Sequence, residues 1–221
     1  MVLETSSPSK TDLRGSKTIK ATLLQIGNAV DGAKLVVSTM TEAEHLADLL
    51  QNLSARGRSP NVLYGVPLAP SQIHRLAMLR NKIGPHSVSV LVDNSSQLGS
   101  AHIFKQATGV ALQVFVKVDL GYHRAGLDYT SKAFDSLIKD IIFNEEHGSA
   151  TLIGFYTHAG HSYGGESDIA AVRLLMEEIK GLYKAAIRVR PRDHARGQSQ
   201  PRYILSVGAT PTATSVQSFL P

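Results

Sequence analysis

The sequence predicts an α/β protein with a parallel sheet, and three observations lead to this fold class. Short β-branched runs recur at intervals of roughly 25–45 residues, each followed by apolar residues at helical spacing. The runs are continuously apolar, which is typical of parallel strands covered on both faces. No Gly-x-Gly-x-x-Gly follows any run, so the dinucleotide-binding fingerprint is missing. The pattern favours a TIM-type (β/α) barrel over an open doubly wound sheet, which would also fit the alternation.

The expected strands and helices follow one another in a regular order. Strands are expected over residues 35–38, 61–66, 87–92, 112–118, 152–156 and 203–207. The helix after the first strand begins with Thr41-Glu42-Ala43-Glu44, which has the form of a capping box. Apolar stripes mark the helices after the second, fourth and fifth strands, and a weaker pattern over residues 95–107 follows the third. Residues 1–16 show no comparable pattern and are expected to form an irregular N-terminal tail.

Length and composition exclude several classes of protein. The chain has 221 residues, 43% of them hydrophobic, which is enough for one sizeable core. No apolar run approaches the ~18 residues that span a bilayer, and the N-terminus lacks the apolar core of a secretory signal. The absence of cysteine excludes disulfides and thiolate metal sites. We therefore expect a cytoplasmic protein with no membrane partner.

Most of the net charge of +5 lies in one segment. Residues 188–202 contain five arginines and one acidic residue, and Pro191, Gly197 and Pro201 interrupt them. A basic interaction module that binds nucleic acid is one interpretation. A solvated basic loop is the favoured alternative, because no aromatic residues are interleaved with the arginines. We therefore expect no nucleic-acid partner.

Polar residues collect after the fourth, fifth and sixth expected strands, at the carboxyl ends where parallel α/β folds place their chemistry. Each of these polar residues can also be explained without a functional site. Arg124 can form an ion pair with Asp119 or Asp128, and Ser/Thr/Gly loops are common. His158 and His161 can ligate a metal, but no third ligand has an obvious spacing, so a hydrogen-bonded pair is the alternative. Their convergence on successive strand ends indicates a site, whose candidates are Arg124, Tyr156, His158, Tyr163, Gly208, Thr210 and Thr212.

The same segments resemble the D-serine dehydratase and D-threonine aldolase family, pyridoxal-phosphate enzymes with a barrel of the alanine racemase type. Val118-Asp119-Leu120-Gly121-Tyr122-His123-Arg124-Ala125-Gly126 is similar to the signature VDxGxxRxG of these barrels. The resemblance runs in order over roughly residues 17–214. The other matching segments are residues 37–44, 63–67, 154–163 and 205–212.

The resemblance implies a fold and a cofactor. The fold is an incomplete (β/α)8 TIM-type barrel over residues 17–221, with strands two to seven and without the family's C-terminal β-domain. The cofactor is pyridoxal phosphate, an electron sink. Its phosphate is expected on the loop of Gly208, Thr210 and Thr212, and its ring near Arg124. A zinc or other divalent metal is expected in the full-length family, but its ligands lie in the β-domain, so we expect no metal ligand in this chain.

The resemblance also implies an activity. Tyr156, His158 and Tyr163 are expected to line the substrate side, with His158 carrying a proton. The expected substrate is a small D-amino acid. The reaction is expected to be either dehydration of D-serine or aldol cleavage of the D-threonine type. A homodimer is one possible assembly.

The lysine that forms the Schiff base with the cofactor has two alternative positions. The family carries it in a Lys-Thr-His-Lys segment, which Lys17-Thr18-Ile19-Lys20 matches directly. That match makes Lys17 the catalytic lysine. A gapless register counted back from Gln25 instead places Arg14 there, and arginine cannot replace the lysine because it stays protonated. A catalytically inactive or truncated relative with part of the cofactor site is therefore the alternative to an active lyase.

Overall fold

A computed structural model describes residues 2–5, 19–26, 32–160, 167–194 and 203–207 of the chain. Seven parallel strands form one sheet in the order β1-β7-β6-β5-β4-β3-β2. The strands are β1 (Val2–Thr5), β2 (Lys34–Val37), β3 (Asn61–Pro67), β4 (Val88–Val92), β5 (Leu112–Lys117), β6 (Ala150–Thr157) and β7 (Ile204–Val207). The helices are α1 (Ile19–Ile26), α2 (Met40–His45), α3 (Ala47–Ala55), α4 (Ile73–Ile83), α5 (Ala101–Thr108), α6 (Lys132–Glu146) and α7 (Asp168–His194), with 3-10 turns η1 (Pro70–Gln72) and η2 (Ser95–Ser100).

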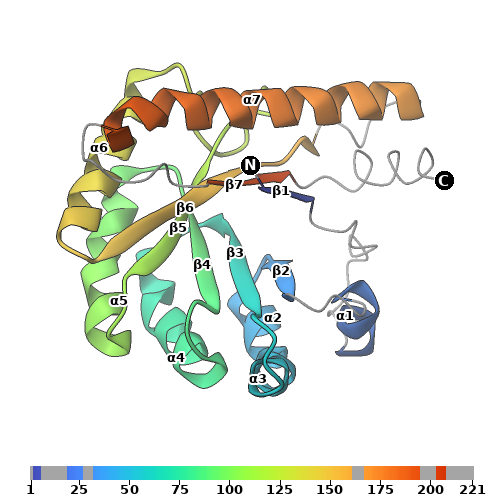
Figure 1. Cartoon of the computed structure of the whole chain (residues 1–221), viewed down its shortest axis with the longest axis vertical. Coiled ribbons are helices and arrows are strands. Elements are labelled where there is room, and N and C mark those ends of the chain that lie inside the picture. The colour runs from blue at the N-terminus through green and yellow to red at the C-terminus, as the bar shows by residue number, and fades with distance from the viewer. Residues whose placement is uncertain (1, 6–18, 27–31, 161–166, 195–202, 208–221) are drawn as a thin grey trace.

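The sheet is wound in one direction and curls into part of a barrel (Figure 1). From β2 to β7 every strand pairs with the next one along the chain, so the strand order never reverses. A doubly wound sheet requires such a reversal. The predicted incomplete TIM-type barrel is therefore confirmed, and the open doubly wound alternative is wrong. All six predicted strands are present as β2 to β7, with ends within two residues of those expected.

The sheet has two different faces. One face packs against the helices in the main core, which includes Val90, Val114, Phe134 and Leu182. The other face carries a smaller apolar cluster made of Leu63, Leu91, Phe115 and Tyr156, with Val36, Ile153 and Ile204 packed against it. Because side chains alternate along a strand, this second set lines the inside of the barrel. The inside is the face that positions the site.

The N-terminal segment and one helix cap differ from expectation. Residues 1–16 were expected to be irregular, but β1 pairs in parallel with β7, from Val2 beside Ile204 to Thr5 beside Val207. The edge of β7 offers unpaired backbone groups, which a short extended segment can satisfy. The predicted capping box at residues 41–44 is also wrong. Thr39 caps α2, and its Oγ1 accepts a 3.1 Å hydrogen bond from the Glu42 amide.

The basic segment is helical at its start. Residues 188–202 were expected to form a loop, but α7 continues through residue 194. Val189 is 1% exposed, so the buried stripe of α7 extends into this segment. Arg188 donates two hydrogen bonds to the Asp135 carboxylate on α6, at 3.1 and 2.7 Å. Among the described residues, no helix is long and apolar enough to cross a membrane.

Candidate functional site

The inward-facing residues at the carboxyl ends of β5, β6 and β7 lie side by side. The strand register places Lys117 beside Tyr156, and Tyr156 beside Ser206. All three side chains are at least 90% buried. In a (β/α) barrel this end of the sheet carries the chemistry. The register alone therefore assembles an amine, a phenol ring and a hydroxyl at the mouth of the barrel.

Lys117 is a buried lysine that the sequence interpretation did not single out. Its side chain is 5% exposed, and its Nζ lies 5.1 Å from the centroid of the Tyr156 ring. Burial is the main cause that lowers the pKa of Lys117, and the nearby Arg124 guanidinium lowers it further. The carboxylates of Asp93, Asp119 and Glu178 act in the opposite direction. A larger fraction of this amine is therefore uncharged than of an ordinary lysine at the same pH.

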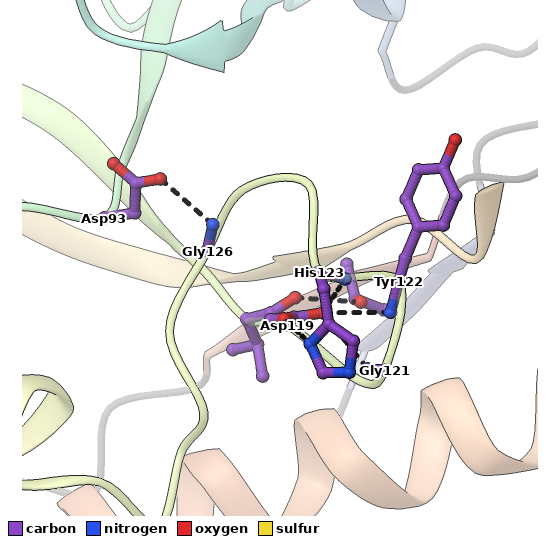
Figure 2. A network of polar contacts seen from close by, with 8 residues as sticks. Asp93, Asp119, Gly121, Tyr122, His123 and Gly126 are labelled. Carbon is purple, nitrogen blue, oxygen red and sulfur yellow. Dashed lines mark hydrogen bonds and ion pairs between the residues drawn. The ribbon is translucent and has the colours of Figure 1, made fainter. Parts of the chain in front are cut away.

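The loop after β5 is folded around the Asp119 carboxylate (Figure 2). Its Oδ1 accepts hydrogen bonds from the amides of Gly121, Tyr122 and His123 at 3.0–3.1 Å, and its Oδ2 lies 2.9 Å from His123 Nδ1. Burial by itself raises the pKa of Asp119, but the bonds from His123 and Gly121 together outweigh it and hold the pKa below its usual value. The charged carboxylate is therefore the form that shapes this loop.

The suggested ion pair of Arg124 with Asp119 or Asp128 is not formed. Asp119 pairs with His123, and Asp128 accepts hydrogen bonds from the amide and hydroxyl of Thr130. The Arg124 guanidinium instead lies 5.1 Å from the Tyr122 ring centroid. A guanidinium stacks readily on an aromatic face, and both nitrogen edges stay able to donate. Arg124 is thus held in place while its donors remain available to an anion.

Gly126 joins this loop to the neighbouring strand end. Its amide donates a 3.0 Å hydrogen bond to Asp93 Oδ2, directly after β4 (Figure 2). Its φ is 105°, and a Cβ there would lie 2.9 Å from the Asp119 amide nitrogen. Only glycine accommodates both the left-handed backbone and the close approach. The last glycine of the VDxGxxRxG signature, Gly126, therefore has a structural reason to be at this position.

The loop after β6 rests on α7 and on the loop after β5. The Ala159 amide donates a 2.7 Å hydrogen bond to Glu178 Oε1, and Glu178 is 2% exposed. A Cβ on Gly160 would lie 2.3 Å from the Tyr122 ring, so this ring packs directly on the glycine. Together with Glu178, His158 and Tyr122 line a small cavity of about 10 Å³, which is room for about one water. These contacts bring His158 and Arg124 to one end of the barrel.

Comparison with known proteins agrees with this geometry. The model of the family "Alanine racemase, N-terminal domain" matches residues 9–212. The chain belongs to this family. The strand order of this chain is that of an incomplete α/β barrel. The resemblance drawn from the sequence motifs is confirmed by the family match.

Curated relatives of this alanine-racemase-type domain are dehydratases. A D-serine dehydratase of Schizosaccharomyces pombe is 38% identical over 203 residues, which are 90% of this chain and 46% of the relative. The D-serine dehydratase of Saccharomyces cerevisiae is 36% identical over 208 residues, 91% of this chain and 47% of the relative. The chain therefore spans about half the length of the curated relatives it matches.

Solved structures show the same domain. D-threo-3-hydroxyaspartate dehydratase from Delftia sp. HT23 superposes with a TM-score of 0.66 at 25% identity, covering 96% of this chain and 49% of that one. D-threonine aldolase from Filomicrobium marinum gives a TM-score of 0.58 at 16% identity, covering 89% of this chain and 48% of that one. The second likeness concerns the fold alone.

The described part of the alanine racemase N-terminal domain contains three of the predicted site residues, namely Arg124, Tyr156 and His158. The others, Lys17, Tyr163, Gly208, Thr210 and Thr212, lie outside the described residues, as does His161. Within the described ranges no cluster of three or more metal-ligating side chains occurs. The sequence interpretation missed Lys117, Asp93 and Glu178. A lysine that ends a continuously apolar run is itself a signal, because lysine is rarely buried without a specific reason.

Proposed function

We propose that this chain carries the pyridoxal-phosphate-binding barrel of a lyase that dehydrates a small D-amino acid such as D-serine. The observation that carries the proposal is the convergence of Lys117, Arg124, Tyr156 and His158 at the carboxyl end of a singly wound barrel. The names of the dehydratase relatives support the reaction class. Aldol cleavage of the D-threonine type is the alternative, supported only by a likeness in fold. The cytoplasm stays the expected location, and a homodimer stays open.

The residues present fit this cofactor. Pyridoxal phosphate is a flat aromatic ring with a phosphate and a phenolic oxygen, both of which carry negative charge. The site offers the Lys117 amine and the Arg124 guanidinium as positive groups, beside the Tyr156 ring. Arg124 can donate to the phenolic oxygen while Tyr122 holds its guanidinium. The loop of Gly208, Thr210 and Thr212, directly after β7, would supply amides and hydroxyls to the phosphate.

Each residue then has a definable task. Pyridoxal phosphate, when bound, would supply an electron sink for the α-carbon of the substrate, which would make the α-proton more acidic. Lys17 would link the cofactor to the chain. His158 would take the α-proton and pass it to the departing hydroxyl, which leaves as water, while Tyr156 and Tyr163 would exclude other water from the substrate side. The Ala159–Glu178 hydrogen bond keeps the backbone next to His158 fixed, so the imidazole starts close to its working position.

The test uses the full 221-residue chain with added pyridoxal phosphate. Borohydride reduction followed by peptide mass spectrometry is expected to place the cofactor on Lys17, and D-serine is expected to yield pyruvate and ammonia. Lys17→Ala should abolish both, whereas Lys20→Ala, a change at an exposed neighbour, should preserve them. The absence of any labelled lysine would refute the proposal. Cofactor binding without turnover would favour the inactive or truncated relative instead.

A further inference from the structure

The amino ends of the strands carry an unusual set of inward-facing residues. Each of the strands β2 to β5 has one residue in the inner apolar cluster, and the residue two positions earlier on the same strand faces the same way. These earlier residues are Lys34, Asn61, Ser89 and Gln113. Barrel interiors are ordinarily filled by bulky branched residues, and polar groups there cost free energy unless they are hydrogen-bonded. Ser89 is fully buried. This layer lies at the opposite end of the barrel from Lys117 and Arg124.

The polar residues form a hydrogen-bonded relay that ends on His86. The Ser89 hydroxyl donates to Asn61 Oδ1 at 2.8 Å. Asn61 Nδ2 then donates to the His86 carbonyl at 2.7 Å and to Gln113 Oε1 at 3.4 Å. Gln113 Nε2 lies 3.1 Å from His86 Nδ1. With the Gln113 oxygen facing Asn61, its nitrogen must donate to Nδ1, so the neutral imidazole carries its hydrogen on Nε2.

His86 is held in a conformation that histidine rarely adopts. Its φ is 58°, in the left-handed region, at a cost of roughly 1–2 kcal/mol for a residue with a side chain. The bond from Asn61 to the His86 carbonyl helps to hold this backbone. Backbone strain of this kind persists where surrounding contacts fix it, and it is concentrated at ligand sites. The relay therefore fixes both the tautomer and the position of the ring.

A cavity of about 260 Å³ lies beside this relay. One wall is polar and includes Lys34, His86 and Gln113, and the other is formed by Phe115, Ile153 and Ile204. Lys34 and His86 are both exposed, so this wall is open to water, although partial burial of the Lys34 side chain lowers its pKa. Among the cavity's lining residues, which all belong to the described part of the chain, none is acidic. The side-chain oxygens of Asn61 and Gln113 already accept hydrogen bonds within the relay, so the polar wall offers mainly donors.

We propose that this amino-end cavity is a second ligand site, which binds a small organic carboxylate. The carboxylate would lie between the Lys34 amine and His86 Nε2–H, and its hydrocarbon part would pack on Phe115, Ile153 and Ile204. The site is at the far end of the barrel from the catalytic residues, so its occupant would be an effector rather than a substrate. The inference does not depend on the proposed lyase activity.

Benzoate is a suitable probe because it combines a carboxylate with a flat apolar body. Binding is measured by titrating the ¹⁵N-labelled full chain and following amide shifts by NMR. Benzyl alcohol, of nearly the same shape but uncharged, should bind at least about tenfold more weakly, since a hydrogen bond to a charged group contributes ~1.5–3 kcal/mol. Inorganic phosphate serves to distinguish a site for any anion from a site for an organic one.

Three variants locate the site. Lys34→Ala and His86→Ala should each weaken benzoate binding about tenfold or more. Gln113→Glu changes little in shape but places a negative charge in the relay, and it should abolish benzoate binding while the protein stays folded. His102→Ala, on the exposed face of α5, is the matched control and should bind benzoate like the unchanged chain. Equal binding of benzoate and benzyl alcohol, tighter binding of phosphate than of benzoate, or benzoate affinity unchanged by Gln113→Glu would each overturn the proposal.

Discussion

The amide of Ala159 donates a 2.7 Å hydrogen bond to the buried Glu178 carboxylate, and so α7 holds the loop that follows β6. Glu178 also attracts the Lys117 amine across the barrel mouth. The contact connects an outer helix to the site without placing Glu178 against a substrate. It therefore makes Glu178 a positioning residue whose effect can be separated from that of the side chains it serves.

Replacing Glu178 should loosen the loop beside His158. Glu178→Ala leaves the Ala159 amide without its buried acceptor, and we expect the free energy of unfolding to fall by about 1–3 kcal/mol. Glu178→Gln keeps an acceptor oxygen and should recover at least half of that loss. Urea unfolding and hydrogen exchange of the Ala159 amide measure both effects. The neighbouring Glu177→Ala, at an exposed position, should behave like the unchanged chain; an equal loss there would contradict the assignment.

A methyl group at Gly160 should act on Arg124 through Tyr122. The added Cβ would occupy the place of the Tyr122 ring, which is 37% exposed and can swing away, so the stability cost should stay near the low end of the usual range, about 1 kcal/mol. Without that ring Arg124 loses its support, so Gly160→Ala should weaken pyridoxal-phosphate affinity severalfold. Fluorescence titration with the cofactor measures the change. Gly99→Ala, where a Cβ meets nothing within 4 Å, provides the control.

The charge on Asp119 should stabilise the fold only above acidic pH. Hydrogen bonds to the carboxylate depress its folded-state pKa, so its contribution is complete above the unfolded pKa of ~3.9 and disappears as pH falls through the folded value. We expect Asp119→Asn to lower the free energy of unfolding by about 1 kcal/mol at pH 7. The gap should stay constant to about pH 5 and close below about pH 4. Urea unfolding across this range tests it, and a gap that persists at low pH would show that the charge is not responsible.

Lys117 should cost stability at neutral pH. Because burial lowers its folded-state pKa, the unfolded chain binds a proton more readily, and stability rises with pH towards the unfolded value of ~10.4. Lys117→Met removes this dependence, so we expect the variant to be at least as stable as the unchanged chain at pH 7. Its advantage should shrink by pH 10. The same variant should bind pyridoxal phosphate at least about tenfold more weakly, which is the usual compromise between stability and function. Thermal melts and cofactor titrations measure the two effects.

The strands that line the site could be predicted because their signals are local. Each of β2 to β7 is an apolar run that pairs with the next run along the chain, and the strand-end motifs follow directly. β1 could not be predicted, because four residues hold no periodicity and their conformation comes from pairing with a distant strand. Lys117 ends an apolar run, which is a local signal, but whether its side chain is buried depends on the curvature of the whole sheet. Glu178 shows the same limit, since only the packing of α7 reveals that its carboxylate faces inward.

The pairing of β1 with β7 also determines the order in which the sheet is completed. Every other pair joins neighbouring strands of the chain, whereas Val2 lies beside Ile204, 202 positions away. Closing so long a loop costs entropy before any hydrogen bond is gained, and contacts of this range slow folding. β2 to β7 can therefore assemble progressively, and β1 is added last. By the same reasoning β1 is the first strand to detach, so its amides should exchange with solvent sooner than those at the centre of the sheet.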